Sequence, residues 1–491
     1  MKYQSTRDGN LTVSSTQAVL EGLAADGGLY IAPCPADFDW KALLSLDACA
    51  MSSAILKALL PDFADMDELV REGYAGKFAA PDLTPLQKVG DRYVLELFHG
   101  PTAAFKDVAL SLLPRLITSA QKTEGMAGDV VILTATSGDT GKAALEGFHD
   151  VPGTKIIVFF PHGGVSAVQR LQMVTQVGDN VQVCAIRGNF DDAQTGVKET
   201  FAACEKMELP KGAHLSSANS INIGRLAPQV MYYFKAYADL VKGGRIAVGD
   251  KVHFVVPTGN FGDILAGYYA KCLGLPVGKL VCASNQNDVL TDFLMTGIYD
   301  RRRPFYKTTS PSMDILVSSN LERMLYLLSG GDSAYIAELM AQLKETGRYQ
   351  VRNKLFERLK EVFACGKCDD KQSEAAIGKV WQEEKYLMDP HTAVGWHVAD
   401  EFCQQREEDT APVVVLSTAS PYKFSGAVLT ALGEEAMDDE FAMMERLHDI
   451  TGTPIPENLA NLQSLPVLHE DVIDKEDIMD YVLRQVEAWE K

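Results

Sequence analysis

Short runs of consecutive apolar residues alternate with helical patterns through the middle of the chain, from about residue 90 to residue 285. Five such runs lie in this stretch and a sixth follows later: 129–135, 155–160, 181–186, 252–256, 279–283 and 413–416. Helical patterns follow them at 142–149, from about 165, and at 191–206. Strands that are apolar along their whole length are typical of parallel sheets covered by helices on both faces. The pattern therefore predicts a doubly wound α/β fold, in which ligands bind beyond the carboxyl ends of the strands.

The remaining stretches have a more helical character. Residues 1 to about 90 are predicted to form a mostly helical domain, in which 42–60 fits a helix that is apolar over much of its surface. The charged stretch from about 290 to 390 is predicted to be a helical insertion between two strands. Residues 425–491 are acidic and helical and are predicted to be a C-terminal appendage, which leaves 91–424 as the α/β core.

Composition narrows the functional classes. The 491 residues include 66 acidic and 46 basic side chains, a net charge of −20, which argues against a nucleic-acid partner because such binding depends on clustered Lys and Arg. No run approaches the roughly 20 apolar residues that span a bilayer, and the start of the chain lacks the apolar block of a signal peptide. Nine cysteines, an odd number, fit reduced thiols. We therefore expect a cytoplasmic protein of several domains. The sequence leaves open whether it is a monomer or a small homo-oligomer.

Two glycine-containing turns follow predicted strands and open helices, at 136–141 and 258–263. Each offers unpaired backbone N–H groups and the positive end of a helix dipole, which suit an anion. The spacing of Gly138 and Gly141 is too short for a Walker loop, and the absence of a G-x-G-x-x-G at a strand end disfavours a nicotinamide cofactor. Either turn alone is equally well a connection that needs glycine for its backbone angles; the pair favours anion binding.

Lys106 is a candidate nucleophile, because it lies at the end of the small-residue loop 98–105 and just before the helical run 108–113. The positive end of a helix disfavours the ammonium form of lysine, which suits a reactive amine. Phe105 beside it can lie against a flat ring. The alternative is a solvated lysine at the start of a helix.

Arg225 and a cysteine pair are the other notable residues. Arg225, at a helix start, either forks on a phosphate or pairs with one of the many acids of the chain. Cys365 and Cys368 form a lone C-x-x-C with no second pair and no clustered histidines. Because a structural zinc site needs four ligands, we predict no metal site.

The order and number of these motifs resemble those of the threonine synthase family over nearly the whole chain. The matching stretches are 3–7, 26–30, 98–107, 136–141, 163–166, 219–229, 258–263, 310–315 and 389–395. The length and the helical N-terminal block resemble the longer enterobacterial and fungal branch. The resemblance implies a pyridoxal 5′-phosphate (PLP) enzyme of fold type II, the tryptophan-synthase-β structural group. Such an enzyme converts O-phospho-L-homoserine and water to L-threonine and phosphate.

The resemblance also implies roles for individual residues. Lys106 would be the lysine that bonds to the cofactor, and Phe105 its ring neighbour. The loop that holds the cofactor phosphate would be Gly259, Asn260, Phe261, Gly262 and Asp263. Asp139 stands where relatives place an Asn against the cofactor's 3′-oxygen, and a carboxylate there would repel a phenolate. Thr418 would face the pyridine nitrogen, and Ser420 stands where family members often carry a histidine.

The substrate's carboxylate and phosphate would meet a second set of residues, namely Ser137, Thr140, Ser220, Arg225 and Asn260. Two alternatives stay open at this point. A serine/threonine dehydratase of the same cofactor group would share the lysine loop and a glycine-rich turn but would not need Arg225 and Ser220 for a second phosphate. A catalytically inactive relative would serve as a binding or regulatory protein.

Overall fold

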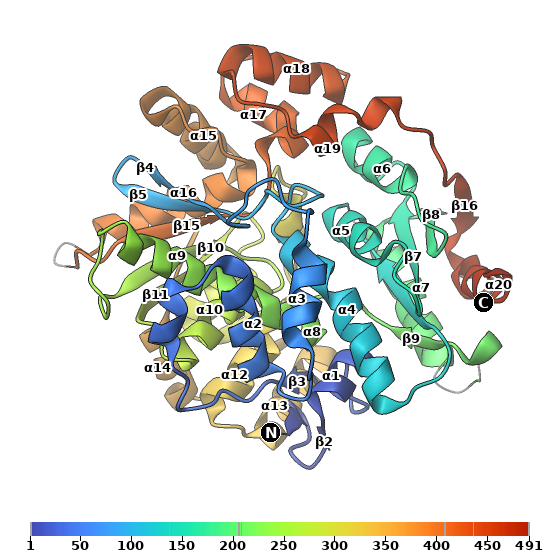
Figure 1. Ribbon diagram of the computed structural model, residues 1–491. Coiled ribbons are helices and arrows are strands. Elements are labelled where there is room, and N and C mark those ends of the chain that lie inside the picture. Colours follow the sequence, from blue (N-terminus) through green and yellow to red (C-terminus); the bar gives the residue numbers. More distant parts are fainter. Residues whose placement is uncertain are drawn as a thin grey trace.

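The computed structural model describes residues 2–136, 138–204, 207, 209–406, 409–435 and 437–489. Two separate sheets dominate this part of the chain (Figure 1). The first has five parallel strands in the order β16 (Asp471–Asp474), β8 (Val181–Arg187), β7 (Thr154–Pro161), β6 (Val130–Ala135) and β9 (His214–Ser216). Alternate residues of β6 and β7 enter different apolar clusters on the two faces.

Helices cover both faces of this first sheet. One face packs against α5 (Asp139–Phe148), and α4 (Lys106–Glu124) packs on α5 in turn. The other face packs against α7 (Phe190–Cys204), which also contacts α20 (Ile478–Ala488) near the C-terminus. The helix α6 (Ala167–Val174) follows β7 and packs beside α5.

The second sheet has six strands in the order β14 (Phe363–Lys367), β11 (Val277–Ser284), β10 (Val252–Pro257), β15 (Val413–Ser417), β5 (Arg92–Glu96) and β4 (Leu86–Val89). All neighbours are parallel except the hairpin β4–β5. On one face lies α10 (Gly262–Cys272), with α9 (Val230–Lys242) packed against it, and on the other lies α16 (Pro390–Gln404). The six strands predicted from apolar runs are all present, and the doubly wound α/β architecture is confirmed.

The N-terminal part combines helices with a small antiparallel sheet of β1 (Tyr3–Ser5), β2 (Thr12–Val13) and β3 (Tyr30–Ile31). Its helices are α1 (Ser15–Glu21), α2 (Ala48–Leu59) and α3 (Met66–Tyr74). The single helix predicted for 42–60 is wrong. A 3₁₀ helix ends at Ser45, and Asp47 starts α2 by accepting the Ala50 N–H at 2.9 Å.

Most of the stretch 290–390 is helical, as expected, with α11 (Val289–Thr296), α12 (Leu321–Ser329), α13 (Ser333–Thr346), α14 (Asn353–Val362) and α15 (Asp370–Glu384). It also contains the small hairpin of β12 (Ile298–Asp300) and β13 (Arg348–Gln350). Cys365 lies in β14, so the cysteine pair belongs to a sheet edge and its short continuation and not to a helix. The C-terminal part contains α17 (Ser425–Ala431), α18 (Glu440–Thr451) and α19 (Glu457–Ala460) before β16 and α20. The domain limits at 90 and 424 remain predictions.

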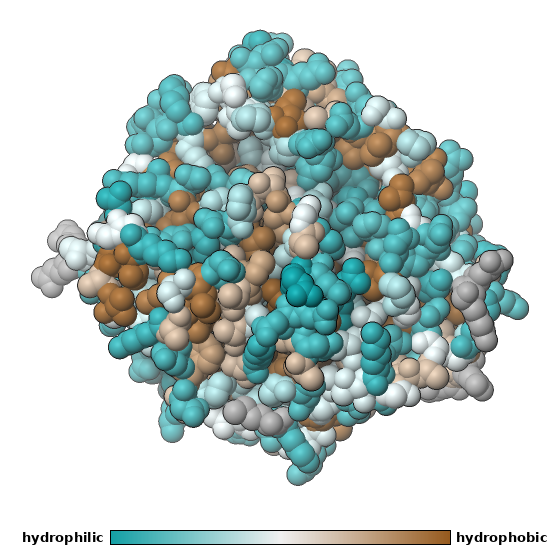
Figure 2. Space-filling view, in the orientation of Figure 1, coloured by the Kyte–Doolittle hydropathy of each residue, from teal (hydrophilic) through white to brown (hydrophobic). Residues whose placement is uncertain are grey.

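Hydrophilic residues dominate the surface in the space-filling view, and the apolar residues on this face form small separate groups (Figure 2). Among the described helices, none combines the length and the apolar character required to cross a bilayer. Within the same residues, no group of three or more His, Cys, Asp and Glu side chains is arranged to hold a metal ion. All nine cysteines are unpaired thiols.

Candidate active site

The loop before α4 is fixed to the end of β15. The Phe105 N–H donates to the Thr418 carbonyl at 2.8 Å, and the Ser420 N–H donates to the Ala103 carbonyl at 3.0 Å. Thr418 and Ser420 are both buried. These bonds place Lys106, the first residue of α4, beside the carboxyl end of a central strand, which is where an open parallel sheet binds its ligand.

Asp107 holds this loop in shape. Its carboxylate accepts hydrogen bonds from the Thr102 hydroxyl and, at 2.9 Å, from the Thr102 N–H. A Cβ on Gly100 would lie 2.4 Å from the Asp107 Cβ, so only glycine fits there. Burial raises the pKa of Asp107 to about 6, although the Thr102 hydrogen bonds oppose the rise. The loop therefore depends on a closely packed local network.

Lys106 is buried, with 7% of its surface exposed, so the alternative of a solvated lysine is wrong. Its Nζ lies 4.6 Å from the centre of the Phe105 ring and 3.8 Å from Asp139 Oδ2. Burial lowers the pKa of Lys106 to about 8; the Asp139 carboxylate opposes this, and the positive charges of Lys423 and Arg225 add to it. About a tenth of this amine is thus unprotonated at pH 7, far more than for an ordinary lysine, as nucleophilic or basic chemistry requires.

The turn at 136–141 is organised by the Thr136 hydroxyl. Its Oγ1 accepts the N–H groups of Gly138 at 3.0 Å and Gly141 at 2.9 Å, and α5 therefore begins at Asp139, earlier than the predicted Lys142. Among the described residues, no acceptor takes the N–H groups of Asp139 and Thr140. These two N–H groups can hold an anion. Ser137 lies outside the described residues.

Asp139 is buried at the start of α5 and faces two lysines. Its Oδ1 accepts hydrogen bonds from Lys423 Nζ at 2.7 Å and from Gln169 Nε2 at 3.1 Å. Its Oδ2 has no hydrogen-bond partner within the described residues. Burial alone would raise the pKa of Asp139, but the charges of Lys423 and Lys106 outweigh it and lower the pKa below its usual value. Asp139 is therefore ionised.

Lys423 and Gln169 were not predicted as site residues. Lys423 belongs to a stretch that the sequence places after a strand, and nothing in its neighbours indicates a buried cation. Gln169 lies in a capping box with Ser166 at the start of α6, a pattern that explains its position without reference to a site. Only the fold brings both side chains to Asp139.

The turn at 258–263 forms the start of α10. Phe261 has a left-handed backbone, with φ of +62°, an uncommon conformation for a side chain of this size and one that marks sites under constraint. Among the described residues, no acceptor takes the backbone N–H groups of 260–263. Asn320 fixes the turn by donating its N–H to the Asn260 carbonyl at 3.0 Å, and Ser318 donates its hydroxyl to the Gly259 carbonyl at 2.8 Å. The turn is a preformed place for an anion.

The Asp263 side chain leaves this turn and enters the core. Its carboxylate accepts the Tyr233 hydroxyl at 3.3 Å, while Oδ2 has no partner within the described residues. Burial raises the pKa of Asp263 to about 7; the Tyr233 hydroxyl and the Lys106 charge oppose the rise. A contact between Asp263 and a cofactor thus concerns its backbone more than its carboxylate and stays a prediction.

Ser220 and Arg225 lie next to this turn. A Cβ on Gly262 would be 3.9 Å from the Ser220 Cβ, and the Asn320 side-chain amide donates to the Ser220 carbonyl at 3.0 Å. Arg225, in the short helix α8 (Ile223–Leu226), is buried and donates to the Ala218 carbonyl at 2.8 Å.

No carboxylate within the described residues pairs with Arg225, so the alternative of an acidic partner is wrong. Burial lowers the pKa of Arg225 to about 10. An unpaired buried guanidinium is costly unless a ligand compensates it, and its planar fork suits a phosphate or carboxylate.

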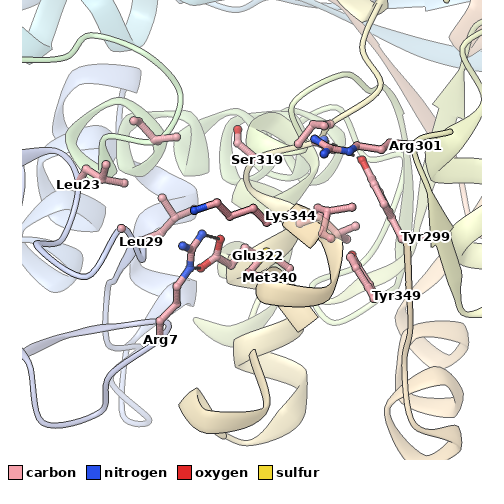
Figure 3. Close-up of a pocket in the computed structure, with 16 residues that line it drawn as sticks. Arg7, Leu23, Leu29, Tyr299, Arg301, Ser319, Glu322, Met340, Lys344 and Tyr349 are labelled. Atoms are coloured by element: carbon pink, nitrogen blue, oxygen red, sulfur yellow. Dashed lines mark hydrogen bonds and ion pairs between the residues drawn. The ribbon is translucent and has the colours of Figure 1, made fainter. Parts of the chain in front are cut away.

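Two cavities lie in the neighbourhood. One of about 840 Å³ is bounded by the loop 98–101, by Ser420, Pro421 and Tyr422, and by 453–458. The other, of about 350 Å³, lies where Ser319 and Ile221 meet the N-terminal part (Figure 3). There Arg7 pairs with Glu322 through two contacts of 2.8 Å. Ser319, which lines this second cavity, lies 3.5 Å from the hydroxyl of Ser220, one of the predicted substrate residues.

Three family models match the chain. They describe the threonine synthase N terminus at residues 2–71, a pyridoxal-phosphate-dependent enzyme at 80–419 and the threonine synthase C-terminal region at 392–478. A threonine synthase of Pseudomonas aeruginosa is 39% identical over 482 residues, which cover 96% of this chain and 98% of that protein. The crystal structure of PLP-bound threonine synthase from Brucella melitensis is 38% identical, with a TM-score of 0.87 over 99% of this chain and all of that one.

A longer group of relatives is equally similar in sequence. The protein named threonine synthase-like 1 in Macaca fascicularis is 38% identical over 478 residues, which cover 94% of this chain. The chain spans only 62% of that relative's length.

Proposed function

The chain belongs to the threonine synthase family of PLP-dependent enzymes, and on this basis we propose that it catalyses the last step of threonine biosynthesis. In that reaction O-phospho-L-homoserine loses its phosphate and gains water to give L-threonine. The observation that carries the proposal is the buried amine of Lys106, with a pKa of about 8, in a site that also contains the unpaired cation of Arg225.

The residues present fit PLP. Asp139 Oδ2 is a buried acceptor without a partner within the described residues, 3.8 Å from Lys106 Nζ. Because Asp139 is ionised, it would accept a hydrogen bond from a protonated 3′-oxygen of PLP and would repel a deprotonated one. The open N–H groups of 260–263 fit a phosphate at the start of α10. Lys106 would hold the cofactor covalently, beside the Phe105 ring. Gly259, Asn260, Phe261, Gly262 and Asp263 would surround its phosphate, with Asp139 and Thr418 at its ring.

Substrate binding would fall to the cationic side of the site. The buried guanidinium of Arg225 pairs with no carboxylate in the described ranges, so a phosphate on the substrate would satisfy it. Ser220 and Asn260 lie at the adjoining turn and would add hydrogen bonds to that phosphate. The N–H groups of Asp139 and Thr140, which have no acceptor in the described part of the chain, would hold the carboxylate at the start of α5.

When bound, PLP supplies an electron sink for the charge that develops at the α-carbon. Lys106 Nζ, freed when the substrate amine replaces it, would be the base that removes the α-proton and then a β-proton, because its lowered pKa keeps part of the amine unprotonated. Arg225 holds the phosphate that leaves from the γ-carbon. Water then adds at the β-carbon, and Lys106 returns protons to the γ- and α-carbons.

The test is a product analysis of the purified chain supplied with PLP and O-phospho-L-homoserine. We expect equal amounts of inorganic phosphate and threonine, and none from Lys106→Ala. A serine/threonine dehydratase would instead release an oxoacid from threonine and leave phosphohomoserine intact. A chain that binds PLP but turns over neither compound would be a binding or regulatory relative, and the proposal would be refuted.

We also propose that the enzyme acts in the cytoplasm as a monomer or small homo-oligomer. Its nine unpaired cysteines suit a reducing compartment. Light scattering of the purified chain measures its assembly state directly.

A further inference from the structure

Three buried side chains share charge at the start of α5. Asp139 is the single carboxylate among them, and its two oxygens face different lysines, Lys423 at 2.7 Å and Lys106 at 3.8 Å. The Lys423 side chain is fully buried, and those of Lys106 and Asp139 are 8% and 3% exposed. Charges that are buried away from water interact strongly, so the protonation state of each of these side chains depends on the other two.

Lys423 is built into this position by the backbone. It lies in the 3₁₀ turn Pro421–Phe424, which is separated from β15 by the short segment 418–420, and its Nζ also donates to the Thr102 carbonyl at 3.0 Å. Thr102 belongs to the loop that carries Lys106, and that loop is bonded to Ser420 through Ala103. One ammonium group therefore joins the start of α5, the Lys106 loop and the end of β15.

The Asp139 carboxylate lies between two lysines and could pair with either one. Its Oδ1 is already satisfied by Lys423 and Gln169, whereas its Oδ2 has no hydrogen-bond partner within the described residues and only approaches Lys106. Were Lys423 absent, the buried carboxylate would need a new counter-charge, and the Lys106 ammonium is the cation next to it. Such an ion pair would keep the Lys106 amine protonated, and a protonated amine cannot act as a nucleophile or a base.

We propose that Lys423 is a positioning residue that engages the Asp139 carboxylate and so leaves the Lys106 amine free to react. Lys423 itself need not touch substrate or cofactor. The consequence for cofactor attachment rests on the proposed function, but the coupling among the three side chains does not.

The charged groups that face Lys106 come from several elements: Asp139 of α5, Lys423 of the 3₁₀ turn, Arg225 of α8, Asp107 of α4 and Asp263 of α10. Within the part of the chain that the structure describes, the shortest ion pair among these groups is that of Asp139 with Lys423, at 2.7 Å. A substitution of Lys423 thus removes one positive charge near Lys106 and leaves Asp139 without its ion-pair partner, while the other charged groups stay in place.

The experiment is competitive acetylation of lysines in the cofactor-free full-length chain across pH, with the Lys106 peptide measured by mass spectrometry. In the wild type we expect a midpoint near pH 8. Lys423→Met should move it upward by about one unit or more, which lowers the reactivity of Lys106 at neutral pH about tenfold. Lys423→Arg keeps the charge and should restore the midpoint.

A matched control is Lys235→Met. Lys235 is also a buried lysine paired with a carboxylate, Asp239 at 2.5 Å, but it lies on α9 and contacts none of the three side chains. It should leave the Lys106 midpoint in place. A folded Lys423→Met chain with an unchanged midpoint would overturn the proposal.

The double variant Lys423→Met/Asp139→Asn covers the case in which Lys423→Met does not fold. With both charges removed, we expect the double variant to fold and its Lys106 midpoint to return close to that of the wild type. A double variant as unstable as the single one would assign Lys423 a packing role and overturn the proposal.

The rate at which PLP binds, followed by its absorbance, is the second readout and should fall in Lys423→Met alone among the three single variants. A wild-type chain that is acetylated as expected but binds no PLP would refute the proposed function and leave the coupling supported.

Discussion

Arg225→Gln should weaken the binding of phosphohomoserine while leaving the fold as stable as before, or more so. Arg225 is a buried cation whose one partner among the described residues is the Ala218 carbonyl, at 2.8 Å. Burial lowers its pKa from 12.5 to about 10. At about 1.4 kcal/mol per pKa unit, the charge lowers the free energy of unfolding by about 3 kcal/mol. Glutamine removes the charge and that cost, and loses one hydrogen bond, worth about 1.5–3 kcal/mol to a charged group.

Arg225→Gln should lower kcat/KM strongly, even though it does not lower stability. Truncating one partner of a buried charged pair costs about 2–5 kcal/mol. A value of about 3 kcal/mol corresponds to about a hundredfold lower kcat/KM. Phosphate release at varied phosphohomoserine concentration measures it, and we expect much of the loss to appear in KM, since the phosphate is bound before it leaves.

Arg323→Gln is the matched control. Arg323 is an equally buried arginine whose pKa burial also lowers to about 10, but its guanidinium donates to the Tyr30 carbonyl, the Asn320 side chain and the Ile221 carbonyl. Losing these bonds should destabilise the chain by about 3 kcal/mol or more in urea denaturation. If Arg225→Gln destabilised the chain as much as this control and left KM unchanged, Arg225 would be structural and the reasoning wrong.

Three further outcomes are expected. Burial raises the pKa of Asp263 to about 7, so the folded chain binds this proton more tightly than the unfolded chain does, and the free energy of unfolding should fall as pH rises from about 4 to 7. Asp263→Asn keeps a partner for Tyr233, and its urea midpoint should depend less on pH across this range. Gly259→Ala would place a Cβ 2.8 Å from the Ser312 carbonyl, and the resulting shift of the turn should weaken PLP binding measured by absorbance titration, whereas an unchanged affinity would remove this turn from the site. If Thr418 faces the pyridine nitrogen, Thr418→Asp should strengthen the electron sink and raise the ratio of elimination products to threonine, and an unchanged ratio would contradict that placement.

How much of the fold the sequence predicts depends on where each strand lies. The strands found from apolar runs, such as β6, β7 and β10, are buried along their length. The strands missed at the sheet edges, such as β14 and β16, have mostly half-exposed or exposed residues. An edge strand needs few apolar side chains, so its residues resemble those of a charged loop or helix. The helical readings of 290–390 and of the C-terminal part therefore concealed two strands of the main sheets.

The candidate site divides in a similar way. Lys106 and the turns at 136–141 and 258–263 are local features, in which the spacing of glycine, hydroxyl and lysine around a helix start indicates their chemistry. The partners of Asp139 are not local, since Gln169 lies 30 positions further along the chain and Lys423 belongs to the turn after β15. No local pattern marks a lysine as buried. Its role follows only from which elements the fold brings together.

The electrostatics of the site run against those of the whole chain. A protein with a net charge of −20 repels phosphorylated molecules at long range. Yet the buried centre contains the cations of Lys423 and Arg225 and the partly protonated Lys106. The anion that faces them is the carboxylate of Asp139, whose pKa is lowered. The pKa values of Asp107 and Asp263 are raised, so these carboxyls retain protons at higher pH than usual and subtract less charge. Burial lowers the pKa of Lys106 and Arg225, so the positive charge of the centre comes from which side chains the fold gathers there and not from burial itself. The two phosphates would meet different groups, the cofactor's at the N–H groups of 260–263 and the substrate's at Arg225, so that neither has to displace the other.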